Sequence, residues 1–128
     1  MTLQVLDTSV LIDVLRGSQA AVDWLGELEQ VPVCSEITRT EVLRGVRSAE
    51  RAPTERLLAA LHWIPVDERV SRRAGELGRQ YRRSHTGLST PDLVIAATAL
   101  ELGAELATGN TRHYPMFERL RPPYDPNG

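Results

Sequence analysis

The sequence predicts an α/β domain with a mainly parallel sheet, and two observations lead to this prediction. Short apolar runs alternate with longer helical patterns along the 128 residues, as they do when parallel strands are joined by crossover helices. The segment 90–102 is apolar on nearly every side, which is typical of a buried helix. The length suits one core, and the chain has no internal repeat or linker, so we expect a single domain over residues 1–128.

The predicted elements begin with a short buried strand at 3–6. A helix at 8–15 follows, and Gly17 can end it. A second helix at 20–29 carries apolar residues at helical spacing. The run VPVCS at 31–35 then predicts a second strand, because an early proline suits an edge or a strand opening.

The middle of the chain predicts helices at 37–47 and at about 54–62. The second of these follows Pro53, which can serve as a helix-starting residue. The run WIPV at 63–66 predicts a third strand, and a long helix over 67–84 comes after it.

The last predicted elements are the helix at 90–102, which Gly103 ends, and a fourth strand in AELAT at 104–108. Beyond them, the sequence RPPYDPNG predicts a flexible tail from about residue 121.

The composition excludes several classes of protein. The net charge is −2, and all fifteen basic residues are arginine. Without lysine, the chain lacks the residue that a P-loop needs on its phosphates. Cys34 is the only cysteine, so an intrachain disulfide and a cysteine-based metal site are excluded. No apolar run is long enough to span a membrane, and the start does not resemble a signal peptide, so we expect a cytoplasmic protein with no membrane partner.

Three acidic residues are candidates for a metal site. Asp7 lies at the carboxyl end of the first predicted strand, where ligands bind in open α/β sheets. Asp92 lies in the first turn of the apolar helix, where amide dipoles stabilise an anion. For both, the alternative is a helix-capping acid.

Glu41 is the third candidate. It lies opposite an apolar helix face and one turn before Gly45. A glycine in mid-helix lowers helix stability, which suggests that another group must pass close to this face of the helix. The alternative is an exposed glutamate that pairs with Arg44. Three converging acids would repel one another without a cation, whereas Mg²⁺ accepts a few carboxylates together with waters. The sequence therefore predicts a magnesium site that could activate a phosphate and a water.

Four segments in this order carry a family resemblance: VLDTSVLIDVL near the start, TRTEVLRG, LSTPDLVIAATAL and LATGN. Together they resemble the signature blocks of the PIN domain, and the short chain with its DTSVLIDVLRG opening resembles the VapC toxins of bacterial toxin–antitoxin pairs. The resemblance implies a three-layer α/β/α fold and an endoribonuclease that uses Mg²⁺ or Mn²⁺.

The resemblance also implies roles for individual residues. Asp7, Glu41 and Asp92 occupy the positions of the family's acidic ligands. Thr108 and Asn110 match the polar pair after the last core strand, which holds a water near the metal and orients an acid. One position departs from the pattern: His113 stands where many members carry a further acid, so a second metal ion is in doubt. His113 could instead contact a phosphate or move a proton, or it could be a packed surface histidine.

The helix at 67–84 separates an apolar stripe from a face rich in arginine. Arg72 and Arg73 on this face are candidates for contacts with RNA phosphates, because guanidinium groups bind phosphate oxygens in a fork. The alternative is an ordinary solvated face.

The resemblance implies three kinds of partner: an RNA substrate, with transfer RNA expected first, a cognate antitoxin protein, and a second copy of the chain. The apolar positions Val14, Leu15 and Trp24 could form the antitoxin groove. Two other functions are weighed against this one. An aspartyl-phosphate enzyme built on Asp7 is disfavoured by the missing lysine and by the missing second aspartate. A non-catalytic module that only binds RNA or protein would be the other alternative.

Overall fold

The computed structural model describes residues 2–125, and its centre is a four-stranded sheet with the strand order β3-β2-β1-β4. Every pairing between neighbouring strands is parallel. The strands are β1 (Gln4–Leu6), β2 (Val33–Ser35), β3 (His62–Ile64) and β4 (Glu105–Ala107). The predicted mainly parallel α/β fold is therefore confirmed, and the carboxyl ends of all four strands lie along one edge.

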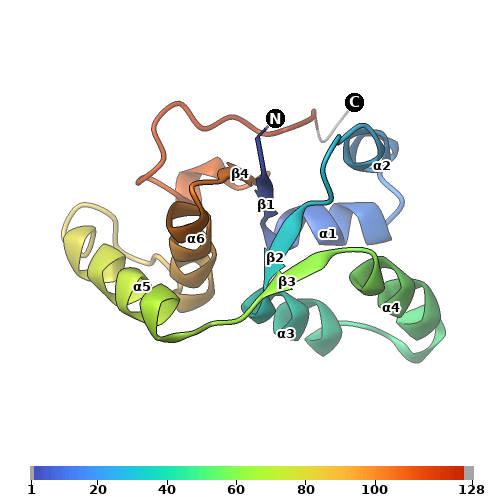
Figure 1. The fold of residues 1–128 in the computed structure, drawn as a ribbon, viewed down its shortest axis with the longest axis horizontal. Helices are drawn as coiled ribbons and strands as arrows, with labels where there is room; N and C mark the ends of the chain where they lie inside the picture. The colour runs from blue at the N-terminus through green and yellow to red at the C-terminus, as the bar shows by residue number, and fades with distance from the viewer. Residues whose placement is uncertain (1, 126–128) are drawn as a thin grey trace.

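Helices cover both faces of this sheet. They are α1 (Thr8–Leu15), α2 (Gln19–Gly26), α3 (Glu36–Arg44), α4 (Arg51–Ala59), α5 (Glu68–Gln80) and α6 (Thr90–Leu102), with short 3₁₀ turns η1 (Ser48–Glu50) and η2 (Thr111–His113). Figure 1 shows α5 and α6 to the left of the strands, and α1, α2 and α4 to the right. This is the three-layer arrangement that the resemblance implies.

The period of two along the strands divides the core between the two faces. Val5 and Val33 point into the cluster formed with α5 and α6. Their neighbours Leu6 and Cys34 point into the cluster formed with α1, α3 and α4. Each short strand therefore joins both cores, which explains why these strands are continuously apolar.

The helix α6 follows its prediction closely. Its first residue is Thr90, the Ser89 hydroxyl caps it, and Gly103 ends it in the left-handed conformation with φ of 61°. Residues 94–99 are all buried. Across residues 2–125, we find no helix with the length and apolar character needed to cross a membrane.

Other boundaries differ from their predictions. The helix predicted over 37–47 already ends at Arg44, so Gly45 is its C-cap and not a mid-helix residue. A Cβ at Gly45 would meet only the Val42 carbonyl, at 4.0 Å. The inference of a close approach at this glycine was therefore wrong. Gly45 instead borders an open groove near Glu41.

The end of the described chain returns to the helices of the first half. In Figure 1 the orange-red segment after η2 crosses above the strands towards α2. There the Tyr124 hydroxyl donates to Asp13 Oδ2 at 2.6 Å, and its ring lies 6.1 Å from that of Trp24. Within the predicted tail, Tyr124 is thus held by two contacts, while residues 126–128 lie outside the described part of the chain.

Candidate active site

Asp7 lies between β1 and α1, and its carboxylate is bound by side-chain hydroxyl groups. It occupies the N-cap position of α1, but its side chain makes no capping hydrogen bond. Instead, Oδ2 accepts hydrogen bonds from Ser9 Oγ at 2.9 Å and from Thr108 Oγ1 at 2.6 Å. The side chain is almost fully buried, at 3% exposure. The capping alternative therefore does not account for this acid.

Thr108 is held in its orientation by the loop that follows β4. Its hydroxyl accepts a hydrogen bond from the backbone N–H of Asn110 at 2.9 Å, so the proton of that hydroxyl is directed to Asp7. The backbone N–H of Gly109 donates to Ser9 Oγ at 3.3 Å. Thr108 therefore orients an acid as expected, whereas Asn110 contributes here through its backbone. A role for the Asn110 side chain stays a prediction.

Asp92 is likewise free of a capping role, because the hydroxyl of Ser89 accepts from its backbone N–H at 3.2 Å. The Asp92 carboxylate points to two groups from η2 and the residue after it. His113 Nδ1 lies 3.1 Å from Oδ2, and the Tyr114 hydroxyl lies 3.2 Å from Oδ1. The half-exposed His113 thus lies beside a candidate metal ligand and is not merely packed on the surface.

Tyr114 joins the two aspartates, and the sequence analysis missed it. Its hydroxyl lies 2.9 Å from Asp7 Oδ1 as well as 3.2 Å from Asp92 Oδ1, and the residue is only 1% exposed. Burial, and then the charges of Asp7 and Asp92, raise the pKa of this phenol well above its usual range, so it stays a hydrogen-bond donor. The only sequence signal was that a buried tyrosine needs a polar partner.

Glu41 belongs to a neighbouring hydrogen-bond network. The hydroxyl of Thr8, the residue after Asp7, donates to Glu41 Oε1 at 2.6 Å and lies 3.1 Å from Thr38 Oγ1. Within residues 2–125, no three Asp, Glu, His or Cys side chains are close enough together to hold a metal ion. The structure therefore brings Asp7 and Asp92 together at the Tyr114 hydroxyl, whereas Glu41 has no hydrogen bond to either and is bound by the hydroxyl of Thr8.

The donor set suits a hard cation. Mg²⁺ is commonly bound by one or two carboxylates and completes its shell with waters and substrate phosphates. Asp7 and Asp92 supply two carboxylates at the carboxyl end of β1 and the start of α6, and hydroxyl groups orient the first of them. These two carboxylates thus fit a magnesium or manganese ion, and Glu41 stays a predicted third ligand.

A thiol nucleophile is not available in this part of the fold. Cys34 is fully buried in β2, and burial raises its pKa to about 12. Because the thiolate is the reactive form, this cysteine is a core residue.

A groove lies beside Glu41, and neither Asp7 nor Asp92 is among its lining residues. Its volume is about 470 Å³. It is lined by Ile12, Leu15, Arg16, Glu41, Val42, Gly45, Val46, Arg47, Glu50, Pro53 and Thr54. Of the residues predicted for an antitoxin groove, Leu15 lies here. Val14 is not among the lining residues, and Trp24 packs against Tyr124.

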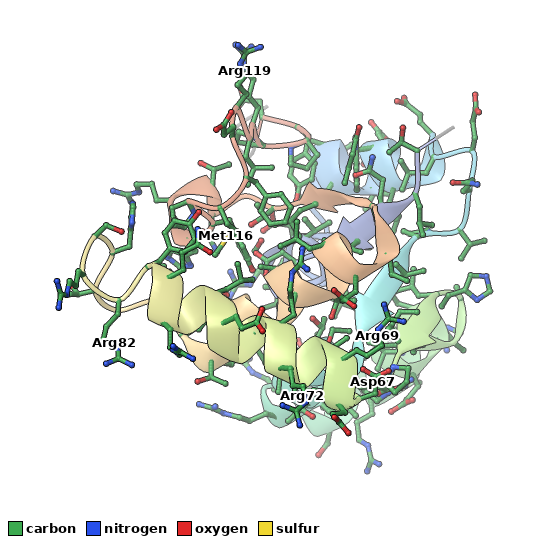
Figure 2. The ribbon with its side chains drawn as sticks, turned by 60° about the vertical axis from the view of Figure 1, so that its left-hand side comes forward. Asp67, Arg69, Arg72, Arg82, Met116 and Arg119 are labelled. Atoms are coloured by element: carbon green, nitrogen blue, oxygen red, sulfur yellow. The ribbon has the colours of Figure 1, made fainter. Side chains whose placement is uncertain are left out.

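The arginines of α5 fall into two groups along the helix. Near its start, Arg72 pairs with Glu68 at 2.8 Å, and Arg73 pairs with Glu101 of α6 at 3.4 Å. Near its end, Arg79, Arg82 and Arg83 line a shallow hollow of about 250 Å³. Figure 2 shows Arg69 and Arg72 at one end of this helix and Arg82 beyond the other.

The helices α5 and α6 run antiparallel. The second arginine group, Arg79, Arg82 and Arg83, therefore lies at the end of α6 that carries Asp92. Arg73 reaches Glu101 in the last turns of α6, whereas a Cβ at Gly78 would lie 3.1 Å from Leu93 in the first turn. Arg79, Arg82 and Arg83 have no ion pair within the described residues. Whether Arg72 and Arg73 contact RNA stays a prediction. The position of the second group, at the Asp92 end and without ion pairs, favours that group for RNA contacts.

Comparisons with known proteins identify the family of this chain. Residues 5–120 match the PIN domain family. The chain is 44% identical over 126 residues to Ribonuclease VapC19 of Mycobacterium tuberculosis, covering 95% of this chain and 100% of that protein. It is 45% identical over 121 residues to Ribonuclease VapC10 of the same organism, covering 93% and 91%. A toxin–antitoxin complex from Klebsiella pneumoniae contains a chain of the same fold, with a TM-score of 0.82 and 28% identity over 95% of this chain and 98% of that one.

Proposed function

Since this chain belongs to the PIN-domain family, and within it to the VapC ribonucleases, we propose that it is a metal-dependent endoribonuclease toxin of a toxin–antitoxin pair. The observation that carries the metal-dependent part is the pair of carboxylates that meet at the Tyr114 hydroxyl. Asp7 is buried and Asp92 lies beside it, so their two negative charges would be balanced by a bound cation. We place the activity in the cytoplasm, where its RNA substrate lies.

The reaction is hydrolysis of an RNA phosphodiester by water. Asp7 and Asp92 would hold a divalent cation, with Glu41 as the third proposed ligand, and the cation would supply Lewis-acid activation of the phosphate. Ser9 and Thr108 fix the buried Asp7, and Asp92, which is more accessible, accepts the proton of the attacking water. His113 lies beside Asp92 Oδ2, where it can pass a proton on or contact a phosphate.

Transfer RNA is the substrate that we propose first, and its cleavage would leave a 3′-hydroxyl and a 5′-phosphate. Both statements come from the family and not from contacts in this chain. A one-metal site is the simpler proposal, because the further acid of many relatives is replaced here by His113.

The experiment that tests the function is cleavage of purified total RNA with Mg²⁺, with Mn²⁺ and with chelator. Cleavage should require the metal, and Asp92→Asn should reduce it by about 100-fold or more, since a metal ligand is lost. Sequencing of the fragment ends would then identify the RNA. If folded protein free of antitoxin cleaves nothing with either metal, the alternative of a non-catalytic binding module replaces this proposal.

The groove beside Glu41 is our proposed binding site for the antitoxin. Its walls offer apolar side chains from α1 and α3 to an amphipathic segment, and one end reaches a site acid. A basic side chain of the antitoxin placed there would be attracted by Glu41 and its neighbouring aspartates. The solved complex from Klebsiella pneumoniae supports an antitoxin partner. A homodimer, which is usual in this family, is proposed on that ground alone.

A further inference from the structure

We propose that Tyr114 is a positioning residue of the metal site, whose buried hydroxyl sets the spacing of the Asp7 and Asp92 carboxylates before a cation binds. This inference rests on the proposed function, because it concerns the same two acids. It goes beyond that function by assigning a specific task to a side chain that is not itself a ligand.

The hydroxyl of Tyr114 occupies a fixed point. The ring is buried among the side chains of the cluster that contains Val5 and Ile95, and it meets Phe117 edge to face at a centroid distance of 6.4 Å. The backbone is fixed as well, since the N–H of Tyr114 donates to the Thr111 carbonyl at 3.1 Å. A ring held in this way cannot follow a moving carboxylate, so the carboxylates must adapt to it.

The contacts of the four carboxylate oxygens identify what the hydroxyl does. Asp7 Oδ2 is engaged by Ser9 and Thr108, and Asp92 Oδ2 lies beside His113. Both Oδ1 atoms face the Tyr114 hydroxyl. This phenol is the one described group that contacts both acids. Asp7 Oδ2 already accepts two hydrogen bonds, whereas Asp7 Oδ1 and both oxygens of Asp92 each have a second lone pair left for a cation.

Core packing alone does not explain a tyrosine at this position. A phenylalanine would fill almost the same space without a buried hydroxyl, which costs about 1–3 kcal/mol when it lacks a partner. The hydroxyl carries a single proton and two acceptors lie within reach, so it is shared between negatively charged groups that otherwise repel each other. The hydroxyl of Tyr114 therefore stabilises the two carboxylates in their close arrangement.

Removal of the hydroxyl should release Asp92 more than Asp7. Asp7 keeps the hydrogen bonds from Ser9 and Thr108, whereas Asp92 keeps only the half-exposed His113. The Asp92 side chain is 19% exposed and can turn towards solvent, away from the other charge. A cation would then have to gather the two acids itself, and its affinity would fall.

The chain offers a matched control for this test. Tyr124 also donates its hydroxyl to an aspartate, Asp13, at 2.6 Å, and has no hydrogen bond to Asp7 or Asp92. Tyr114→Phe and Tyr124→Phe thus remove the same group from the same kind of pair. Only the first removal touches the proposed metal site.

The experiment is calorimetric titration of Mn²⁺ into the wild-type chain and both variants, without RNA. We expect Tyr114→Phe to weaken Mn²⁺ binding by about 10-fold or more, the range typical of residues that orient metal ligands, and Tyr124→Phe to leave it unchanged. In RNA cleavage, excess Mn²⁺ should restore most of the rate of Tyr114→Phe, because the defect lies in metal affinity.

Each other outcome overturns the inference. Equal Mn²⁺ affinity in the wild type and in folded Tyr114→Phe would show that Tyr114 only packs, while the proposed function would stand. A wild-type chain that binds no Mn²⁺ would overturn the metal site and this inference with it. If Tyr114→Phe fails to fold, the near-ultraviolet difference spectrum of Tyr124→Phe on Mn²⁺ addition replaces the titration. This variant keeps Tyr114, so the absence of a tyrosine signal would contradict the close coupling of Tyr114 to the metal site.

Discussion

The hydroxyl groups of Ser9, Thr108 and Tyr114 set the chemistry available to Asp7. Each donates to its carboxylate, and none of these contacts is with the backbone of α1. A carboxylate with three hydroxyl donors can stay charged in a buried position, which a metal ligand must do. The same residue type at the same helix position would serve as an ordinary cap if these hydroxyls were absent.

His113 provides a prediction at this scale. His113→Asp would place a carboxylate near Asp92 Oδ2, where the imidazole nitrogen now lies at 3.1 Å. Repulsion should lower the stability of the metal-free protein by about 0.5 kcal/mol, a small value because His113 is half exposed. The variant should gain more stability from Mn²⁺ than the wild type does, because the added charge favours the cation.

Thermal melts in chelator and in Mn²⁺ would measure both effects, with His85→Asp as the control. His85 contacts Ser84 and the ring of Tyr81 and has no contact with either aspartate. If His113→Asp and His85→Asp respond alike to Mn²⁺, His113 does not stand at a metal-ligand position.

Single residues were only partly predictable from the sequence. Asp7 and Asp92 could be proposed from their places at a strand end and a helix start, because parallel topology brings such places together. The capping alternative could not be rejected from sequence, since the decisive contacts come from Thr108 and Tyr114, about a hundred residues after Asp7. For the same reason Tyr114 was missed.

At the scale of elements, the two ends of α5 differ in charge pairing. Its first arginines are neutralised by Glu68 and Glu101, whereas Arg82 and Arg83 extend beyond its end near the start of α6. Guanidinium groups without carboxylate partners retain their full attraction for phosphate.

We therefore predict that Arg82→Glu with Arg83→Glu weakens RNA binding by about 10-fold at low salt and reduces its salt dependence. Arg72→Glu with Arg73→Glu should have a much smaller effect, since these side chains already face carboxylates. Fluorescence anisotropy of a labelled RNA hairpin, in an Asp92→Asn background and over a salt series, would measure this. If Arg72→Glu with Arg73→Glu has the larger effect, the RNA-binding surface lies at the start of α5 instead.

The order of strands and helices was predictable, but some of their ends were not. The helix predicted to begin after Pro53 begins at Arg51. Proline is tolerated there because the first four N–H groups of a helix have no partner within the helix. Similarly, α3 ends with backbone hydrogen bonds of the 3₁₀ type, from Gly45 to the Val42 carbonyl and from Val46 to the Leu43 carbonyl. These bonds could not be predicted from the pattern of side chains.

At the scale of the whole molecule, Tyr124 packs against α1 and α2, so residues far apart in the sequence lie in contact. The ring lies against Trp24 and the hydroxyl binds Asp13. This contact gives Asp13 a structural role.

We predict that Tyr124→Phe lowers the free energy of unfolding by about 1 kcal/mol and Tyr124→Ala by about 2 kcal/mol, because the first loses one charge-assisted hydrogen bond and the second also loses ring burial. Urea unfolding followed by circular dichroism would measure both values. Identical midpoints for the wild type and Tyr124→Ala would mean that this contact contributes nothing to stability.

The overall topology was the least accessible feature from residues alone. Alternating strands and helices predict a parallel sheet, but the order β3-β2-β1-β4 depends on which crossovers pack together over long separations. The central position of β1, between β2 and β4, brings the start of the chain next to its last strand.

This adjacency has a consequence for synthesis on the ribosome. Asp7 is synthesised first, and Thr108 and Tyr114 follow it by 101 and 107 residues. Until then β1 has no β4 beside it, and the Asp7 carboxylate lacks two of its three hydroxyl donors. A growing chain that stops before these residues is therefore without an assembled centre.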